Sequence, residues 1–197
     1  MNGLPLLPER IETERLVLRR WSLADAEDVL ADAADPEWSR FLPVPKPYER
    51  RHAEQAVAGW VLEDWSTNPD WAIEIAGRAS GGINLRIDHQ HRRGELGYAL
   101  ARRHWGKGYM TEAVRAVIDA AFATLPDLAR VQAGANARNR ASIRVMERLG
   151  MTHEGTIPHA PQGAEFKRRE AGVIYAILRE EWEKIRSRAP AVLRDEV

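Results

Sequence analysis

The alternation and spacing of hydrophobic positions along the chain predict a mixed α/β protein. Seven segments have the short alternating or apolar pattern of β-strands: 15–19, 71–75, 83–87, 95–100, 130–135, 151–157 and 173–179. Four segments have apolar residues at the three- and four-residue spacing of amphipathic helices: 22–33, 48–64, 109–125 and 142–149. The pattern therefore predicts strands and helices in one α+β domain.

The order of these segments limits the topology. The strands at 71–75, 83–87 and 95–100 follow one another and are expected to be antiparallel, with a longer hairpin loop spanning Gly77 to Gly82. The helix that follows them leads to the strand at 130–135, which predicts a parallel pair with a right-handed crossover. A loop containing proline and glycine, from Pro158 to Gly172, is expected to join the last two strands.

Length and composition narrow the class of protein. A chain of 197 residues is enough for one domain, which we place at 9–185, with terminal extensions at 1–8 and 186–197. Lys plus Arg and Asp plus Glu both number 29, so no overall charge favours nucleic acid or a membrane surface. Cysteine is absent, which excludes disulfides and a cysteine nucleophile. The chain has no signal peptide or membrane-spanning pattern, so we expect a cytoplasmic protein.

The turn Gly106-Lys107-Gly108 lies between the strand at 95–100 and a long helix. Backbone N–H groups at a helix N-terminus attract anions, so this turn predicts a phosphate site. Its spacing fits neither the nucleoside-triphosphate loop nor the dinucleotide fingerprint. The alternative is a tight turn in which glycine is needed only for its positive φ.

The neighbouring residues extend this turn into a longer match. Three blocks, Glu14–Arg19, Trp105–Ala113 and Asn139–Met151, occur in an order and spacing that resemble the GNAT family of N-acetyltransferases. They are most similar to the branch that contains the ribosomal-protein alanine acetyltransferases. The resemblance implies a single GNAT domain with a mixed, mostly antiparallel seven-stranded twisted sheet, flanked by helices, whose central parallel strands splay apart. It also implies acetyl-CoA as cosubstrate and no metal.

The resemblance implies a role for the residues around the glycine turn. Backbone N–H groups from about Arg103 to Gly108 would hold the pyrophosphate of coenzyme A, and a backbone N–H near Ala99 or Leu100 would stabilise the oxyanion. Residues expected to contact the cofactor are Ala99, Leu100, Arg103, His104, Trp105, Gly106, Lys107, Gly108, Tyr109, Asn139 and Ser142.

Amine attack on a thioester needs a general base and a proton donor for the leaving thiolate. Glu95 is the candidate base, acting through water, although it could instead be a strand-end carboxylate paired with an arginine. Many relatives have a tyrosine acid where Met146 stands, so we assign the leaving side to Asn139 and Ser142. For Ser142 the alternative is a helix N-terminal residue without a chemical role.

The acceptor is a primary amine, either a protein N-terminus or a small molecule, and attack is expected to be direct in a ternary complex. The variable segments Trp38–Trp65 and Pro158–Gly172 would select it. His89 and His91 lack a third metal ligand and are expected to be exposed loop residues. Two alternatives stay open: an acyl-CoA-binding protein without turnover, and a nucleotide-binding module. The chain is expected to be a monomer or a homodimer.

Overall fold

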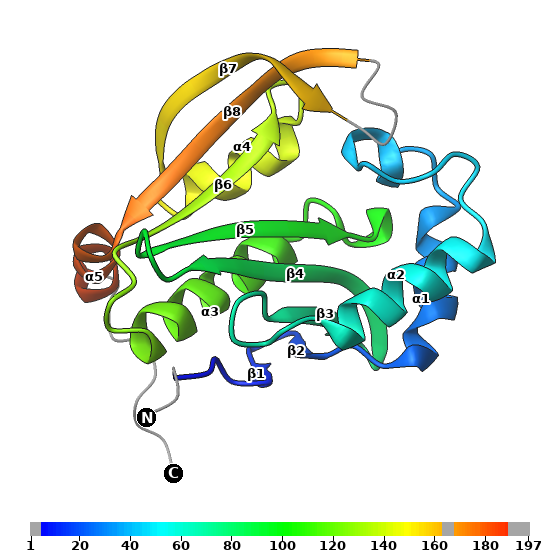
Figure 1. Cartoon of the computed structure of the whole chain (residues 1–197), viewed down its shortest axis with the longest axis horizontal. Coiled ribbons are helices and arrows are strands. Elements are labelled where there is room, and N and C mark those ends of the chain that lie inside the picture. Colours follow the sequence, from blue (N-terminus) through cyan, green and yellow to red (C-terminus); the bar gives the residue numbers. More distant parts are fainter. Residues whose placement is uncertain (1–4, 163–167, 189–197) are drawn as a thin grey trace.

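The computed structural model describes residues 5–162 and 168–188 and contains one mixed sheet covered by helices (Figure 1). In the described residues the strands are β1 (Arg10–Glu12), β2 (Val17–Arg20), β3 (Asp70–Ile75), β4 (Arg78–Asp88), β5 (Arg93–Leu100), β6 (Arg130–Asn136), β7 (Thr152–Gln162) and β8 (Arg168–Leu178). The helices are α1 (Ala26–Ala33), α2 (Arg50–Leu62), α3 (Tyr109–Thr124), α4 (Arg140–Arg148) and α5 (Arg179–Arg188). Three short 3₁₀ turns are η1 (Leu23–Asp25), η2 (Trp38–Phe41) and η3 (Arg102–His104).

The sheet order is β1-β2-β3-β4-β5-β6-β8-β7, and among the strands that the structure describes only the β5–β6 pair is parallel. The mixed, mostly antiparallel sheet is thus confirmed, as is the parallel connection through α3. The described residues form eight strands, one more than the seven expected. The additional strand, β1, is only three residues long and lies at the edge, where alternation of side chains gives little signal.

Two loop predictions were wrong. The hairpin between β3 and β4 turns on Ala76 and Gly77 alone, with φ of 52° and 77°, and Ile75 pairs directly with Arg78. Gly81 and Gly82 are therefore strand residues rather than loop residues. Most of the predicted 158–172 loop is also strand, because β7 extends to Gln162 and β8 begins at Arg168. Residues 163–167 of that loop lie outside the described residues.

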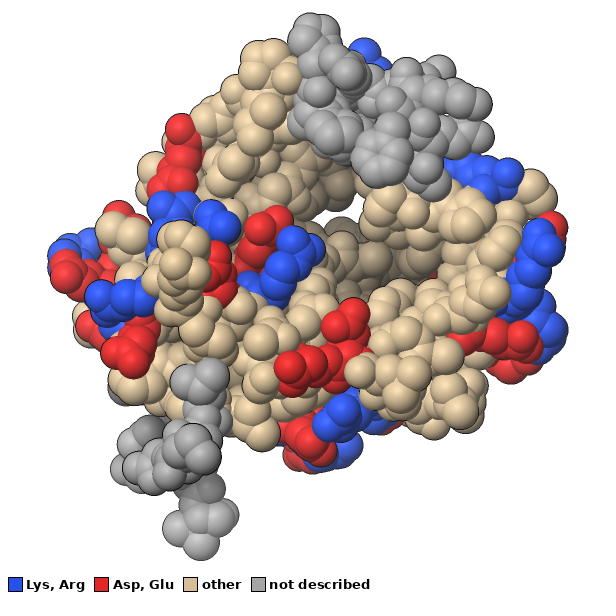
Figure 2. Space-filling view, viewed as in Figure 1, with Lys and Arg blue, Asp and Glu red and all other residues tan. Residues whose placement is uncertain are grey.

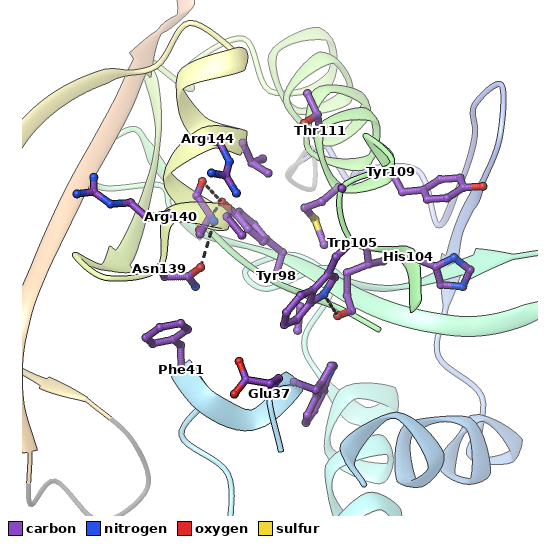
Figure 3. Close-up of a pocket in the computed structure, with 18 of the residues that line it drawn as sticks. Glu37, Phe41, Tyr98, His104, Trp105, Tyr109, Thr111, Asn139, Arg140 and Arg144 are labelled. Carbon is purple, nitrogen blue, oxygen red and sulfur yellow. Dashed lines mark hydrogen bonds between the residues drawn. The ribbon is translucent and has the colours of Figure 1, made fainter. Parts of the chain in front are cut away.

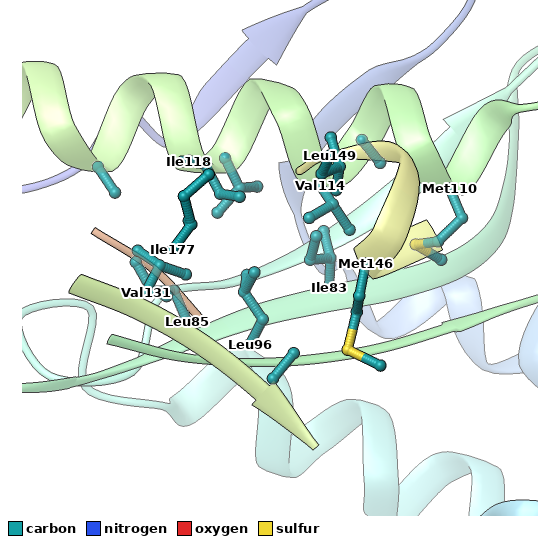
Figure 4. Packing of buried hydrophobic residues seen from close by; sticks show 14 of the residues in the cluster. Ile83, Leu85, Leu96, Met110, Val114, Ile118, Val131, Met146, Leu149 and Ile177 are labelled. Atoms are coloured by element: carbon teal, nitrogen blue, oxygen red, sulfur yellow. The ribbon is translucent and has the colours of Figure 1, made fainter. Parts of the chain in front are cut away.

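The larger hydrophobic core lies between the sheet and the helices α3 and α4 (Figure 4). Val114, Val117 and Ile118 of α3 are fully buried, and the core they join includes Leu85 of β4 and Leu96 of β5. Burying each such aliphatic side chain contributes about 1.5–3 kcal/mol. A smaller core, which includes Trp21 and Val57, lies under α1 and α2. The helices α3 and α4 therefore anchor β4 and β5 on one face, and α1 and α2 pack on the other face over β3 and β4.

The strands β5 and β6 separate along their length. Their parallel pairing covers residues 93–96 of β5 and 130–133 of β6 and then ends. Beyond this point residues 97–100 still pair with β4, while residues 134–136 still pair with β8. Two backbone edges consequently face each other across the divergence, as the resemblance implied, and Figure 1 shows β6 rising away from β5.

The segment before β1 packs on the domain within the described residues. Leu7 is buried, and its carbonyl oxygen accepts a hydrogen bond of 2.8 Å from Trp65 Nε1. Pro8 receives a similar bond of 3.0 Å from Trp71 Nε1. The domain limits of 9–185 stay a prediction, and residues 189–197 of the carboxyl extension lie outside the description. None of the described helices is long and apolar enough to span a bilayer.

Candidate active site

A cleft of about 530 Å³ opens where β5 and β6 diverge. Its walls are the end of β5, the first turn of α3, the start of α4 and the 3₁₀ turn η2. Figure 2 shows a hollow near the centre of this face, bordered largely by uncharged side chains. The described residues that line the cleft are Glu37, Trp38, Arg40, Phe41, Leu42, Tyr98, Ala99, Leu100, His104, Trp105, Gly106, Gly108, Tyr109, Met110, Thr111, Asn139, Arg140, Ala141, Ser142, Arg144, Val145 and Arg148.

The glycine turn shapes one end of the cleft. Gly106 and Gly108 have φ of 74° and 84°, a conformation that costs other residues about 1–2 kcal/mol. Gly108 is the N-cap of α3, and the N–H groups of the first turn have no acceptor within the helix. Both glycines therefore have the positive φ that a tight turn without a ligand would also require. The same turn also presents a helix N-terminus to the cleft, which is the geometry of an anion site.

An ion pair from the amino-terminal segment braces this turn. The Arg15 side chain donates to the carbonyl oxygen of Lys107 at 2.9 Å and contacts the Glu112 carboxylate at 2.6 Å. Thr13 Oγ1 donates to the same carboxylate at 2.6 Å. Burial alone would raise the pKa of Glu112, but these hydrogen bonds hold it below its ordinary value. No local sequence pattern indicates this brace, because its members lie about 100 positions apart.

The free edge of β5 presents backbone donors to the cleft. The N–H of Ala101 donates to the Ser80 carbonyl oxygen on the β4 side at 2.8 Å. Alternate residues of a strand point the same way, so the N–H of Ala99 also faces β4. The N–H groups of Tyr98 and Leu100 then face the divergence. The predicted oxyanion donor near Ala99 or Leu100 is thus narrowed to Leu100, whose carbonyl oxygen is held by Trp105 Nε1 at 2.7 Å.

The start of α4 brings two predicted residues together with an unpredicted one. Asn139 is the N-cap of α4, and its side-chain oxygen accepts from the Ser142 N–H at 3.2 Å. The hydroxyl of Ser142 lies 2.8 Å from that of Tyr98, whose ring is labelled in Figure 3. Burial raises the pKa of Tyr98 to about 12, although the bond to Ser142 acts in the opposite direction. Tyr98 was missed because its position in an alternating strand resembles that of any core residue.

Two carboxylates, Glu95 and Glu37, lie differently with respect to the cleft. Glu95 pairs in register with Arg86 and Gln132. It does not belong to the cleft lining of the described chain, and it alternates to the face opposite Leu96 and the α3 core. Glu37 is the only acidic side chain among the described residues that line the cleft. No sequence motif indicates Glu37, whose carboxylate lies near Phe41 in Figure 3.

Nine of the eleven predicted cofactor residues line the cleft. The side chain of Arg103 instead forms an ion pair with Asp32 of α1 and donates to Ser80 Oγ at 3.1 Å. Lys107 is exposed and contributes its carbonyl oxygen to the Arg15 brace. Burial lowers the pKa of His104, and the charges of Arg103 and Lys107 act in the same direction. A neutral imidazole at pH 7 follows for His104.

A basic stripe on α4 forms another wall of the cleft. Arg140, Arg144 and Arg148 are spaced by four residues, which places them along one side of the helix. All three are exposed, and none has a carboxylate partner among the described residues. Together with the α3 N-terminus they make this end of the cleft suitable for anions.

Three further positions considered in the sequence have clear structural settings. Met146, at the position of the family's tyrosine, is buried in the main core and presents no hydroxyl to the cleft. His89 lies 3.0 Å from the Ser66 carbonyl oxygen, and His91 lies 2.8 Å from the Asp88 carboxylate. Within residues 5–162 and 168–188 no group of three potential ligands could hold a metal ion.

Comparison with known proteins gives the same family as the geometry. The sequence model of the acetyltransferase (GNAT) domain matches residues 15–152. The chain is 32% identical over 154 residues to the uncharacterized N-acetyltransferase p20 of Bacillus licheniformis, covering 76% of this chain and 85% of the relative. It is 33% identical to YdaF of Bacillus subtilis (strain 168), a candidate ribosomal N-acetyltransferase, over 58% of this chain and 68% of the relative.

A solved structure supports this assignment across most of the chain. The GNAT-family acetyltransferase of Bacillus anthracis superposes with a TM-score of 0.74 and 26% identity, covering 87% of this chain and 99% of that one. The matched residues 15–152 include both the glycine turn and the start of α4. The chain therefore belongs to the GNAT family and is an N-acetyltransferase that resembles the ribosomal-protein branch of that family.

Proposed function

We propose that the protein transfers the acetyl group of acetyl-CoA to a primary amine, either a protein N-terminus or a small molecule, by direct attack in a ternary complex. The observation that carries this proposal is the alignment of three features in one cleft. These are the free edge of β5, the N-terminus of α3 and the hydroxyl of Ser142. An extended amide-bearing ligand with a phosphate group at one end suits this arrangement.

Each part of acetyl-CoA has a candidate partner. The pyrophosphate would lie against the N–H groups of the Gly106–Gly108 turn, with the α4 arginines beside it. The pantetheine arm would pair with the free edge of β5, between that strand and β6. The thioester oxygen would then face the Leu100 N–H, a type of donor that stabilises an oxyanion by about 3 kcal/mol.

The transfer replaces the C–S bond of the thioester with a C–N bond. The amine nitrogen attacks the carbonyl carbon, and the electron pair of the breaking bond leaves with sulfur. The Ser142 hydroxyl passes its proton to that sulfur as it takes another from solvent, so that the solvent supplies the proton and no serine alkoxide forms. The proton lost by the nitrogen passes through water to the general base, which we propose is Glu95. Glu95 precedes Ala99 by four residues, or about 13 Å along the strand, so more than one water would be required.

The acceptor is proposed to enter beside η2. Phe41 and Trp105 give this end of the cleft apolar surface, and Glu37 gives it a carboxylate that forms an ion pair of 3.3 Å with Arg40 of the same turn. A carboxylate among aromatic rings suits an ammonium group, which is the form in which most amines exist at neutral pH. Glu37 is thus proposed to bind the acceptor before its amine loses a proton.

A screen of acetyl transfer tests the proposed function. Release of free thiol from acetyl-CoA would be measured with peptides bearing free N-termini and with small amines. We expect acceptor-dependent release for at least one amine class, together with the acetylated product by mass spectrometry.

A second candidate function is acyl-CoA binding without turnover. Two observations favour it: Met146 replaces the family's tyrosine acid, and Glu95 lies outside the cleft lining. Thermal stabilisation by acetyl-CoA without thiol release on any acceptor would support this binder. Acceptor-dependent release would exclude it.

A further inference from the structure

Tyr98 occupies a position that neither the family's glycine turn nor the predicted catalytic residues explain. Its ring extends from β5 toward α4, where its hydroxyl lies 2.8 Å from Ser142 Oγ and 3.4 Å from the Ser142 carbonyl oxygen. The Ser142 N–H is already committed to Asn139 at 3.2 Å. The backbone N–H and the side-chain hydroxyl of Ser142 are therefore both hydrogen-bonded to neighbouring side chains.

The donor inventory of this pair decides its chemistry. A serine hydroxyl carries one proton and two acceptor lone pairs, and a tyrosine hydroxyl likewise has one proton. If Ser142 donated to Tyr98, it would have no proton left for a thiolate. If Tyr98 donates to Ser142 Oγ instead, the serine proton is free to point into the cleft. The phenol proton could also go to the Ser142 carbonyl oxygen, but that oxygen lies at 3.4 Å and Oγ at 2.8 Å. The shorter distance and the greater acidity of the phenol favour donation from Tyr98 to Ser142 Oγ.

Tyr98 itself is a poor acid for the leaving group. Burial raises its pKa to about 12, whereas an ordinary thiol has a pKa of about 8.5. Transfer of the phenol proton to a thiolate would consequently be unfavourable, so the proton stays on Tyr98 at neutral pH. The protonated Tyr98 hydroxyl can therefore remain a hydrogen-bond donor to Ser142 Oγ throughout the reaction.

We propose that Tyr98 is a positioning residue for acetyl transfer, whose hydroxyl donates to Ser142 Oγ and so directs the Ser142 proton toward the sulfur of coenzyme A. This inference rests on the proposed function and on the leaving-group role assigned to Ser142. It adds no new covalent step, because the C–N bond forms and the C–S bond breaks as described above. Tyr98 acts only through Ser142.

A double-mutant cycle tests this dependence. Tyr98→Phe removes one oxygen and keeps the ring, and we expect it to lower kcat about tenfold while the KM for acetyl-CoA stays within about twofold. In a Ser142→Ala background the same change should have no further effect on kcat. The matched control is Tyr175→Phe, which removes a hydroxyl 3.5 Å from Glu147 on the same helix and should leave kcat within about twofold.

Three results would overturn the inference. One is a normal kcat for Tyr98→Phe while Ser142→Ala is slow, and another is a full tenfold loss added by Tyr98→Phe to Ser142→Ala. The third is an unchanged kcat for Ser142→Ala, which would also remove the leaving-group assignment. Failure of the proposed function is distinguishable, because it would show in the wild-type enzyme rather than only in the variants. Melting temperatures of all variants would confirm that each is folded.

Discussion

Asp70 provides a prediction about how stability depends on pH. It begins β3 and is only 8% exposed, and its Oδ1 accepts a 2.8 Å hydrogen bond from Trp21 Nε1. Burial raises the pKa of Asp70 to about 7; the Trp21 bond lowers it, and the charge of Glu63 raises it further. The unfolded chain should titrate this carboxyl near its ordinary value of about 3.9. The perturbation is Asp70→Asn, which keeps an oxygen acceptor for Trp21 and removes the ionisation.

The sign follows from proton binding. Between about pH 4 and pH 7 the folded protein keeps the Asp70 proton and the unfolded chain has lost it, so raising the pH favours unfolding in this interval. Each pH unit contributes about 1.36 kcal/mol. From pH 5 to pH 7 the wild type should therefore lose about 2.5 kcal/mol relative to Asp70→Asn. Above pH 7 the folded Asp70 ionises as well, and the difference becomes constant.

Urea unfolding of both proteins at pH 5, 6, 7 and 8 measures this difference. Subtracting one protein from the other cancels the titration of the remaining carboxylates, such as Glu112, whose pKa is lowered. We expect Asp70→Asn to be increasingly more stable than wild type up to pH 7. A difference that does not change with pH would refute the reasoning, because it would mean that Asp70 ionises alike in both states.

Four further substitutions test the roles proposed for residues of the candidate site. Ser142→Ala should lower turnover about tenfold with little change in acetyl-CoA affinity, and unchanged turnover would exclude it as the leaving-group donor. Gly108→Val should abolish acetyl-CoA binding in calorimetry. The control Gly77→Val changes a residue with a similar positive φ in a remote turn and should bind acetyl-CoA normally. Equal loss of binding in both variants would mean that backbone strain, and not a block at the phosphate site, causes the loss. Glu95→Gln should lower kcat about 100-fold, because it removes the proposed base. Glu37→Gln should raise the KM for cationic amines, because it removes the carboxylate proposed to bind them. A loss of kcat in Glu37→Gln with a raised KM in Glu95→Gln would make Glu37 the base and Glu95 the residue that binds the amine.

Much of the fold follows from local patterns that the sequence displays directly. The apolar spacing of α3 and the alternation of β5 are local, and the Gly106–Gly108 turn joins them, so their arrangement was predictable. The three-residue strand β1 is too short for alternation to register. Gly81 and Gly82 suggested a loop because glycine weakens a strand. In the fold they make room instead, since a Cβ on Gly82 would lie 2.8 Å from Trp21 Cζ2.

The candidate site likewise contains residues that local sequence patterns indicate and residues that only the fold brings together. The glycine turn and the start of α4 are contiguous blocks, so their cofactor-facing residues could be identified from order and spacing. The contact between Tyr98 and Ser142 joins positions 44 residues apart, and the Arg15–Glu112 brace joins positions 97 apart. Glu37 enters the cleft only through the path of η2. Contacts of this kind depend on tertiary packing, which no local pattern encodes.

The central claim is that the cleft between β5 and β6 binds acetyl-CoA. Titration of the protein with acetyl-CoA in a calorimeter tests it most directly. The account predicts saturable binding of one acetyl-CoA per chain, lost in Gly108→Val and retained in Gly77→Val. An absence of binding to the folded wild-type protein at millimolar acetyl-CoA would contradict it.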